Sequence, residues 1–138
     1  MANWAIQCNE RYFKPMTEYF HRKLLERKFL MMDETPLQVL NEPNKRPESK
    51  SYVWLMRSGE DGQHPIVYYR YSPSRNRRNF MLTFLEDGRC SLSNNPSENS
   101  IRPITVGRKN WLFSNSVEGA EASMGIYTIV EMAKLHGI

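Results

Sequence analysis

The sequence predicts a single α+β domain in which an antiparallel three-strand meander is flanked by helices. Residues 1–28 have helical periodicity, residues 29–75 hold three apolar segments separated by polar loops, and residues 76–138 are mainly helical in pattern. The chain has 138 residues, of which 40% are hydrophobic. That is enough apolar material for one core but little for two, so we treat residues 1–138 as one domain with these three parts.

The first part reads as two consecutive helices. Apolar residues recur at spacings of three or four, with charged residues between them, and this spacing indicates an amphipathic helix. Pro15 interrupts the pattern, and proline is best tolerated in the first turn of a helix. We therefore expect one helix to end near Lys14 and a second to start at Pro15. The expected apolar face consists of Cys8, Tyr12, Met16, Tyr19 or Phe20, and Leu24.

The middle part changes to strand-like composition. Residues 29–40, 51–58 and 66–71 are rich in aromatic, β-branched and long apolar side chains, and the loops between them contain Pro, Gly, Asn and Glu. Three strands joined in sequence order as an antiparallel meander is the simplest assignment. Trp54, inside the second segment, is expected to be a core aromatic rather than a base-stacking residue.

The last part predicts helices and turns. Residues 77–85 fit a short helix before a turn at 86–88. Asn95, Pro96 and Glu98 fit the N-cap, first and third positions of another helix, which Pro103 should end. A final helix at 119–135 is expected to bury one apolar face, formed by Ala122, Ile126, Ile129, Val130 and Ala133.

Several protein classes are excluded by what the chain contains. Its longest apolar run, 29–32, is far shorter than a membrane span, and no apolar leader follows Met1, so we expect a cytoplasmic protein with no membrane partner. Cys8 and Cys90 are far apart, and the three histidines are scattered. Neither a disulfide framework nor a zinc site is predicted.

The positive charge is concentrated in one stretch. The formal net charge is +4, and residues 70–109 hold eight basic groups against three acidic ones, whereas the rest of the chain is close to neutral. Arginine suits phosphate because its planar guanidinium presents several donors. The stretch therefore predicts either a DNA-binding surface or a solvated basic face. The candidate DNA-binding residues are Arg75, Arg77, Arg78, Arg102, Arg108 and Lys109.

Two acidic residues are candidates for metal-dependent chemistry. Asp33 directly follows the apolar run of the first strand segment, where a carboxylate is costly to bury without a cation or donors. The alternative is that residues 33–36 form a polar bend between two short strands. Glu98 begins a late helix, where the alternative is a capping role. Ribonuclease-H-like nucleases place metal-binding carboxylates at such a first strand and late helix, and there the carboxylates hold two Mg²⁺ ions.

Taken together, six ordered strings make the chain resemble the transposases of the insertion-sequence-66 family. The similarity extends over nearly the whole chain. The strings are Asp33-Glu34-Thr35-Pro36, Arg70-Tyr71-Ser72-Pro73-Ser74-Arg75, Asp87-Gly88-Arg89, Asn94-Asn95 with Glu98, Ile101-Arg102-Pro103, and Gly107-Arg108-Lys109-Asn110-Trp111-Leu112-Phe113.

The resemblance implies a ribonuclease-H-like catalytic domain that cuts and joins DNA through an Asp-Asp-Glu set with Mg²⁺. Asp33 matches the first of these carboxylates and Glu98 the last, so these two would be the catalytic and metal-binding residues. In the family, the second aspartate lies on a strand after the Ser-Pro-Ser-Arg motif. Here Arg75 leads directly into the next motif, and neither Asp61 nor Asp87 aligns with the lost residue. The fold is therefore expected to be incomplete.

Three readings follow for function. The first is a shortened transposase, defective in metal-dependent DNA cleavage and strand transfer because its middle carboxylate is missing, with weakened Mg²⁺ binding. The second is a non-catalytic DNA-binding or interfering module derived from a transposase. The third is a degenerate, poorly folded product. The resemblance implies the DNA ends of a mobile element as partner and a bacterial, nucleoid-associated location. A lost strand would expose a sheet edge, so a homo-oligomer is a further expectation.

Overall fold

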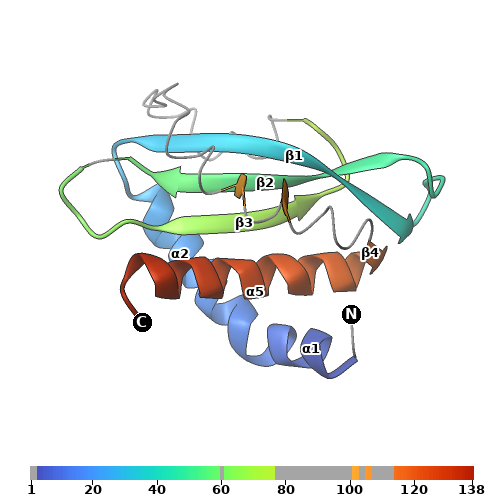
Figure 1. Ribbon diagram of the computed structural model, residues 1–138, viewed down its shortest axis with the longest axis horizontal. Coiled ribbons are helices and arrows are strands. Elements are labelled where there is room, and N and C mark those ends of the chain that lie inside the picture. The colour runs from blue at the N-terminus through green and yellow to red at the C-terminus, as the bar shows by residue number, and fades with distance from the viewer. Residues whose placement is uncertain (1–2, 60, 77–100, 103–104, 107–113) are drawn as a thin grey trace.

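The centre of the fold is a four-stranded mixed sheet with the strand order β3-β2-β1-β4 (Figure 1). The first three strands form the expected antiparallel meander, whereas the short β4 is parallel to β1. The α+β class and the meander are thus confirmed, and β4 was not predicted. The strands are β1 (Leu30–Asn41), β2 (Lys50–Ser58), β3 (Val67–Ser72) and β4 (Ser114–Ser116). The computed structural model describes residues 3–59, 61–76, 101–102, 105–106 and 114–138.

β1 is one continuous strand of 12 residues. From Thr35 to Leu40 its buried positions alternate with partly exposed ones, as expected for a strand whose two faces meet different surroundings. Residues 33–36 pair with β2 throughout, with Asp33 opposite Leu55 and Pro36 opposite Tyr52. The alternative of a polar bend at this place is therefore wrong, and Asp33 lies within a sheet.

The N-terminal part is a continuous helical stretch made of α1 (Asn3–Cys8), the π-helical turn η1 (Asn9–Phe13) and α2 (Lys14–Leu25). Pro15 lies in the first turn of α2, as predicted. The predicted apolar face is only partly correct: Leu24 is buried in the core, and Phe20, the alternative to Tyr19, packs against it. Tyr12, Met16 and Tyr19 are instead 66, 48 and 49% exposed. The π-helical turn has i→i+5 hydrogen bonding, so the residues after it do not keep the helical phase assumed from the sequence.

The final helix, α5 (Val117–Leu135), begins slightly earlier than predicted. Its N-cap is Ser116, whose Oγ accepts a hydrogen bond from the Gly119 N–H at 3.1 Å. The predicted buried face is only partly correct here too, since Ala122 is fully buried but Val130 is 42% exposed. The buried stripe recurs every four residues and includes Ala120, Met124, Thr128 and Met132.

The different choice of face follows from where α5 docks. It lies alongside β3, at the edge of the sheet (Figure 1). Thr128 Oγ1 accepts the Tyr69 N–H at 3.1 Å, and Met132 Sδ accepts the Val67 N–H at 3.3 Å. Side chains that can accept hydrogen bonds therefore face β3. The purely apolar pattern in the sequence does not identify them.

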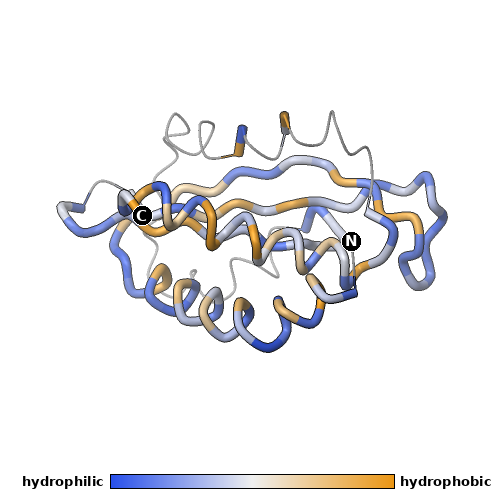
Figure 2. The backbone as a smooth tube through the Cα atoms, turned by 60° about the horizontal axis from the view of Figure 1, so that its bottom comes forward, coloured by the Kyte–Doolittle hydropathy of each residue, from blue (hydrophilic) through white to orange (hydrophobic). Residues whose placement is uncertain are grey.

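The core lies between the sheet and the helices. Figure 2 shows hydrophilic loops at the two ends of the sheet and more hydrophobic backbone between them. Trp54 is fully buried, which confirms it as a core aromatic. The core cluster consists of Leu24, Leu30, Leu37, Val39, Val53, Trp54, Leu55, Met56, Ile66, Val67, Tyr69, Tyr71, Ile101, Ala120, Met124 and Met132.

Several predicted elements lie outside the described residues. These are the helix at 77–85, the turn at 86–88 and the helix start at Asn95 and Glu98. Trp111 and Cys90 lie outside them as well, whereas Cys8 is a free thiol. Across the described part of the chain, no helix combines the length and the apolar character needed to cross a bilayer.

Candidate functional site

Asp33 lies in the fourth position of β1 and is half-buried. Its cross-strand neighbour is Leu55 on β2, which in turn pairs with Tyr69 on β3, so Asp33 stands in a row with apolar core residues. Asp33 Oδ1 accepts a hydrogen bond from the Glu34 N–H at 2.8 Å. The sheet therefore fixes the carboxylate that the sequence selects as the first catalytic residue, although its catalytic role stays a prediction.

Glu34, the next residue, pairs with Trp54 in the register and so projects to the opposite face of the sheet. Its Oε1 receives two contacts from Arg75: from Nε at 2.8 Å and from Nη2 at 2.7 Å. The Glu34 side chain is 11% exposed, whereas that of Arg75 is 69% exposed. The carboxylate raises the pKa of Arg75, through its hydrogen bond and its charge. A predicted DNA-binding arginine therefore lies beside the strand that carries Asp33.

A partly buried ion pair that the sequence does not indicate lies just after β1. Glu42 pairs with Lys45 at 2.9 Å, and Ser51 on β2 donates a hydrogen bond to the same carboxylate. Burial raises the pKa of Glu42, but the bonds from Ser51 and Lys45 outweigh this effect and hold it below its usual value. These residues lie in a polar loop and at the start of a strand, and no sequence motif distinguishes them.

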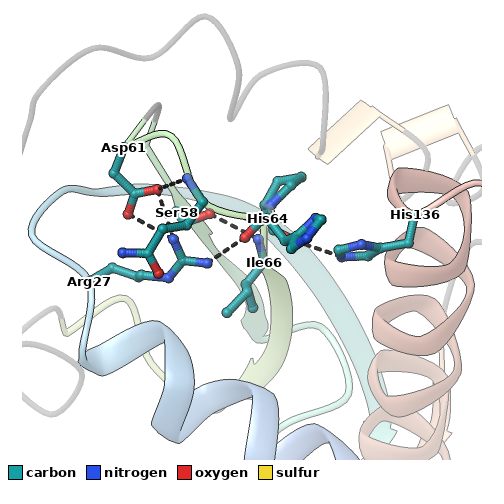
Figure 3. Close-up of polar contacts among 8 residues, drawn as sticks. Arg27, Ser58, Asp61, His64, Ile66 and His136 are labelled. Atoms are coloured by element: carbon teal, nitrogen blue, oxygen red, sulfur yellow. Dashed lines mark hydrogen bonds and ion pairs between the residues drawn. The ribbon is translucent and has the colours of Figure 1, made fainter.

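Asp61 is held in a buried ion pair in the loop between β2 and β3. Arg27 Nη1 contacts both carboxylate oxygens, at 2.7 and 2.8 Å, and each side chain is 8% exposed. Arg27 Nη2 also donates to the His64 carbonyl, and the His136 ring bonds to the Pro65 carbonyl at 3.0 Å (Figure 3). Burial acts to raise the pKa of Asp61, but the Arg27 and backbone hydrogen bonds lower it overall. This aspartate serves to fix the loop.

The other predicted DNA-binding and metal-binding residues are only partly described. Arg102 is exposed, and its neighbour Ile101 is 7% exposed within the core cluster. The motif that contains both thus combines a core anchor with an outward arginine. Glu98, Arg77, Arg78, Arg108 and Lys109 lie outside the described residues.

The described acidic residues do not form a metal-binding set. In the part of the chain that the structure describes, no group of three or more His, Cys, Asp and Glu side chains could hold a metal ion. Asp33 and Glu34 point to opposite faces of β1, and Asp61 is occupied by Arg27. The residues described here therefore do not fit a two-Mg²⁺ centre.

Two cavities lie on the helical side of the sheet. One, of about 420 Å³, is bordered by η1, α2, β3 and α5 and includes His21 and Arg70. His21 stacks on Tyr68 with ring centroids 4.6 Å apart, and burial, followed by the Arg70 charge, lowers its pKa. The other, of about 810 Å³, is a mainly apolar groove between α2 and the end of α5. Asp33 lines neither of them.

Two curated proteins are similar to part of the chain. The chain is 38% identical over 55 residues to the uncharacterized protein y4hP of Sinorhizobium fredii (strain NBRC 101917 / NGR234), which is 40% of this chain and 10% of that protein. It is 37% identical over 62 residues to the uncharacterized protein y4qI of the same organism, 45% of this chain and 12% of that one. The matches thus span about a tenth of these curated relatives, and no solved structure matches.

A family model covers far more of the chain. The model described as "Transposase IS66 family" matches residues 1–81 and residues 74–122. Its two matches overlap at residues 74–81. Together they extend over most of the 138 residues, and on this ground the chain belongs to the IS66 transposase family.

Proposed function

We propose that this chain is a shortened transposase catalytic domain that binds DNA but is defective in metal-dependent cleavage and strand transfer. One observation carries the proposed defect: apart from Asp33, the aspartate described in the structure is Asp61, and Asp61 is held by Arg27 in a buried ion pair. If Asp61 left that pair, Arg27 would remain as a buried positive charge without its partner, which is energetically costly. It is therefore a poor substitute for the missing middle carboxylate.

The two family matches support the loss of that carboxylate. They overlap at residues 74–81, which include the last two residues of the Ser-Pro-Ser-Arg motif, and the family's second aspartate would follow this motif. In two-metal catalysis, one metal ion lies on each side of the reacting phosphate, and protein carboxylates hold both ions in place. Asp33 and Glu98 alone would supply fewer ligands than such a clamp requires, and binding of Mg²⁺ by them would be weak. The meander with Asp33 on its first strand also supports a ribonuclease-H-like ancestry.

The basic stretch supports DNA as the partner. Arg75 and Arg102 are both exposed, so their guanidinium groups can reach a phosphate. Contacts to phosphate are independent of base sequence and weaken as salt rises, because counterions compete for the same charge. DNA affinity should therefore fall steeply with salt and depend little on the sequence of the duplex.

Two measurements test the proposal. Gel-shift titration with short duplexes at low and moderate salt should show binding that weakens with salt. Arg75→Ala should reduce both the affinity and, by about 1, the slope of log K against log salt. Arg22→Ala, which removes an exposed arginine from α2, is the charge-matched control and should have a smaller effect. Absence of binding to any duplex at low salt would refute the DNA partner.

The catalytic part is tested with supercoiled plasmid. We expect no nicking when the purified chain is incubated with Mg²⁺ or Mn²⁺. Metal-dependent nicking that disappears in Asp33→Asn would contradict the proposed defect, because it would show that the remaining carboxylates suffice.

A second candidate function is interference with a full-length transposase at the same DNA. The exposed Arg75 and the concentration of charge in residues 70–109 favour it, since DNA binding without cleavage would block those sites. Adding this chain to a transposition assay of an intact family member should then reduce its activity, and Arg75→Ala should reduce it less. An unchanged rate would contradict interference.

A further inference from the structure

We propose that Glu42, Lys45 and Ser51, here called the Lys45 cluster, position Arg75 for DNA by fixing the segment that precedes it. The inference rests on the proposed DNA contact of Arg75. It assigns a purpose to a partly buried ion pair that lies outside the family motifs. A chain of contacts runs from the end of β1, through Pro73 and Arg75, to Glu34.

The cluster joins the ends of two strands. Glu42 directly follows β1, and its carboxylate is 5% exposed; Ser51 lies near the start of β2. Lys45 Nζ is 2.9 Å from Glu42 Oε1 and donates to Ser51 Oγ at 3.0 Å, while Ser51 donates to the second carboxylate oxygen. All three side chains are thus mutually satisfied, as buried polar groups must be.

The third N–H donor of Lys45 bonds to a residue outside the cluster. An ammonium group has three N–H donors, and here they serve Glu42, Ser51 and the carbonyl of Pro73. Pro73 has no N–H, so its carbonyl is its one backbone hydrogen-bonding group. Lys45 therefore ties the loop between β1 and β2 to the residues that follow β3.

The tied segment ends at Arg75. Ser72 Oγ donates to the Ser74 carbonyl at 2.9 Å, which bends the chain locally. Two residues after Pro73, the guanidinium of Arg75 then meets Glu34 through Nε and Nη2. Its Nη1 has no partner among the described residues, and the side chain is 69% exposed. One edge of the guanidinium is thus fixed while another can contact a phosphate.

Fixing Arg75 in advance favours DNA binding. A free arginine loses rotamer freedom when it contacts a phosphate, and a side chain that is already held loses less. The Lys45 cluster contributes to this order without touching DNA itself. It is a positioning group, and its loss should act only through Arg75.

The test uses a neutral variant that keeps the fold. Glu42→Gln combined with Lys45→Met removes the donor to Pro73 without leaving a buried charge unpaired. Lys50→Met, which removes an exposed lysine at the start of β2 and outside the cluster, is the control for the loss of a lysine side chain. The first readout is the NMR signal of the Arg75 Nε–H in the free protein. It should shift and exchange faster with water in the Glu42/Lys45 variant and stay unchanged in Lys50→Met.

The second readout is a double-mutant cycle in DNA affinity. Arg75→Ala and the Glu42/Lys45 variant should each weaken binding, and combining them should weaken it no further than Arg75→Ala does. An unchanged Arg75 signal, or losses that add, would overturn the positioning role. If Arg75→Ala leaves DNA affinity unchanged while the NMR signal still responds, the proposed DNA contact fails and the mechanical link stands.

Discussion

The two edges of the sheet are closed in different ways. At the β3 edge, α5 supplies Thr128 and Met132 as acceptors for backbone N–H groups. At the β1 edge, the neighbouring described strand is the three-residue β4, which pairs only at Val39 and Asn41. An edge closed by a helix is protected from pairing with another chain, whereas a short strand covers little of the edge beside it.

The two sides of the sheet also differ in the kind of residues they carry: residues that stabilise the fold lie on one side and candidate functional residues lie on the other. On the β3 side lie α5, the Arg27–Asp61 pair and the close contact of η1 with α5. On the β1 side lie Asp33, Glu34 and Arg75, which the family resemblance and the charge select as functional. We expect substitutions on the β3 side to lower the free energy of unfolding, and substitutions on the β1 side to leave it nearly unchanged.

The largest effect is expected for Arg27→Met. It leaves Asp61 as an uncompensated charge at a position where the side chain is 8% exposed. Breaking such a pair should lower the free energy of unfolding by about 3 kcal/mol. Urea denaturation followed by circular dichroism measures this change. Arg46→Met, an exposed arginine in the loop between β1 and β2, is the control and should have little effect.

The same pair predicts a pH dependence. The pKa of Asp61 is lowered in the folded state, so its contribution is present above the unfolded pKa and disappears as pH falls through the folded one. The protein should therefore lose stability on acidification below about pH 4. In Arg27→Met, the loss of folding stability on acidification that comes from Asp61 should be smaller. An identical pH profile for both proteins would argue against the ion pair.

Gly125→Ala should have the next largest effect. A Cβ at this position would lie 1.9 Å from Asn9 Oδ1 and 3.0 Å from its Cγ, and Asn9 is 4% exposed. Asn9 and the neighbouring backbone must shift to make room for the new methyl group. This shift should lower the free energy of unfolding by about 2 kcal/mol. Adding Asn9→Ala creates the needed space, so the double variant should recover most of the loss. If it does not recover, α5 and η1 do not pack as closely as described.

The sequence predicts the strands better than it predicts the helix faces. The composition of the apolar segments and of the polar loops between them was sufficient to place β1, β2 and β3, and Pro15 marked the start of α2. Both signals are local, because strand composition and the tolerance of proline in a first turn need no knowledge of the rest of the fold. For Asp33 the sequence left both a strand and a polar bend open, and its pairing with Leu55 in β2 shows that it lies in a strand.

Tertiary contacts decide what the sequence left open. Tyr12 and Val130 were expected inside because they are apolar, yet small and polar residues such as Asn9 and Thr128 take the buried positions at the helix contacts. β4 consists of two serines and an asparagine, which have no strand preference of their own. The Arg27–Asp61 pair joins residues 34 positions apart, and no local pattern could indicate it.

Thr128→Val tests the closure of the β3 edge directly. Valine has nearly the same shape but removes the acceptor of the Tyr69 N–H and the donor to the Met124 carbonyl. Losing a buried hydrogen bond of this kind should cost about 1 kcal/mol. Thr128→Ser keeps the hydroxyl and should lose less of that hydrogen-bond contribution. Hydrogen exchange at the Tyr69 amide should become faster in the valine variant alone, and unaltered exchange would contradict the role assigned to Thr128.

The smallest effect on stability, and the sharpest contrast between the two sides, is expected for Arg75→Ala. Although its contacts with Glu34 are short, the side chain is largely in water, where ion pairs are weak because solvent screens both charges. Because Glu34 is 11% exposed, the unfolding midpoint should fall slightly, by far less than in Arg27→Met, while DNA affinity falls. A marked loss of stability would place Arg75 among the structural residues and remove the separation between the two edges. A nearly unchanged midpoint with weaker DNA binding would show that the β1 side retains residues for DNA contact rather than for the fold.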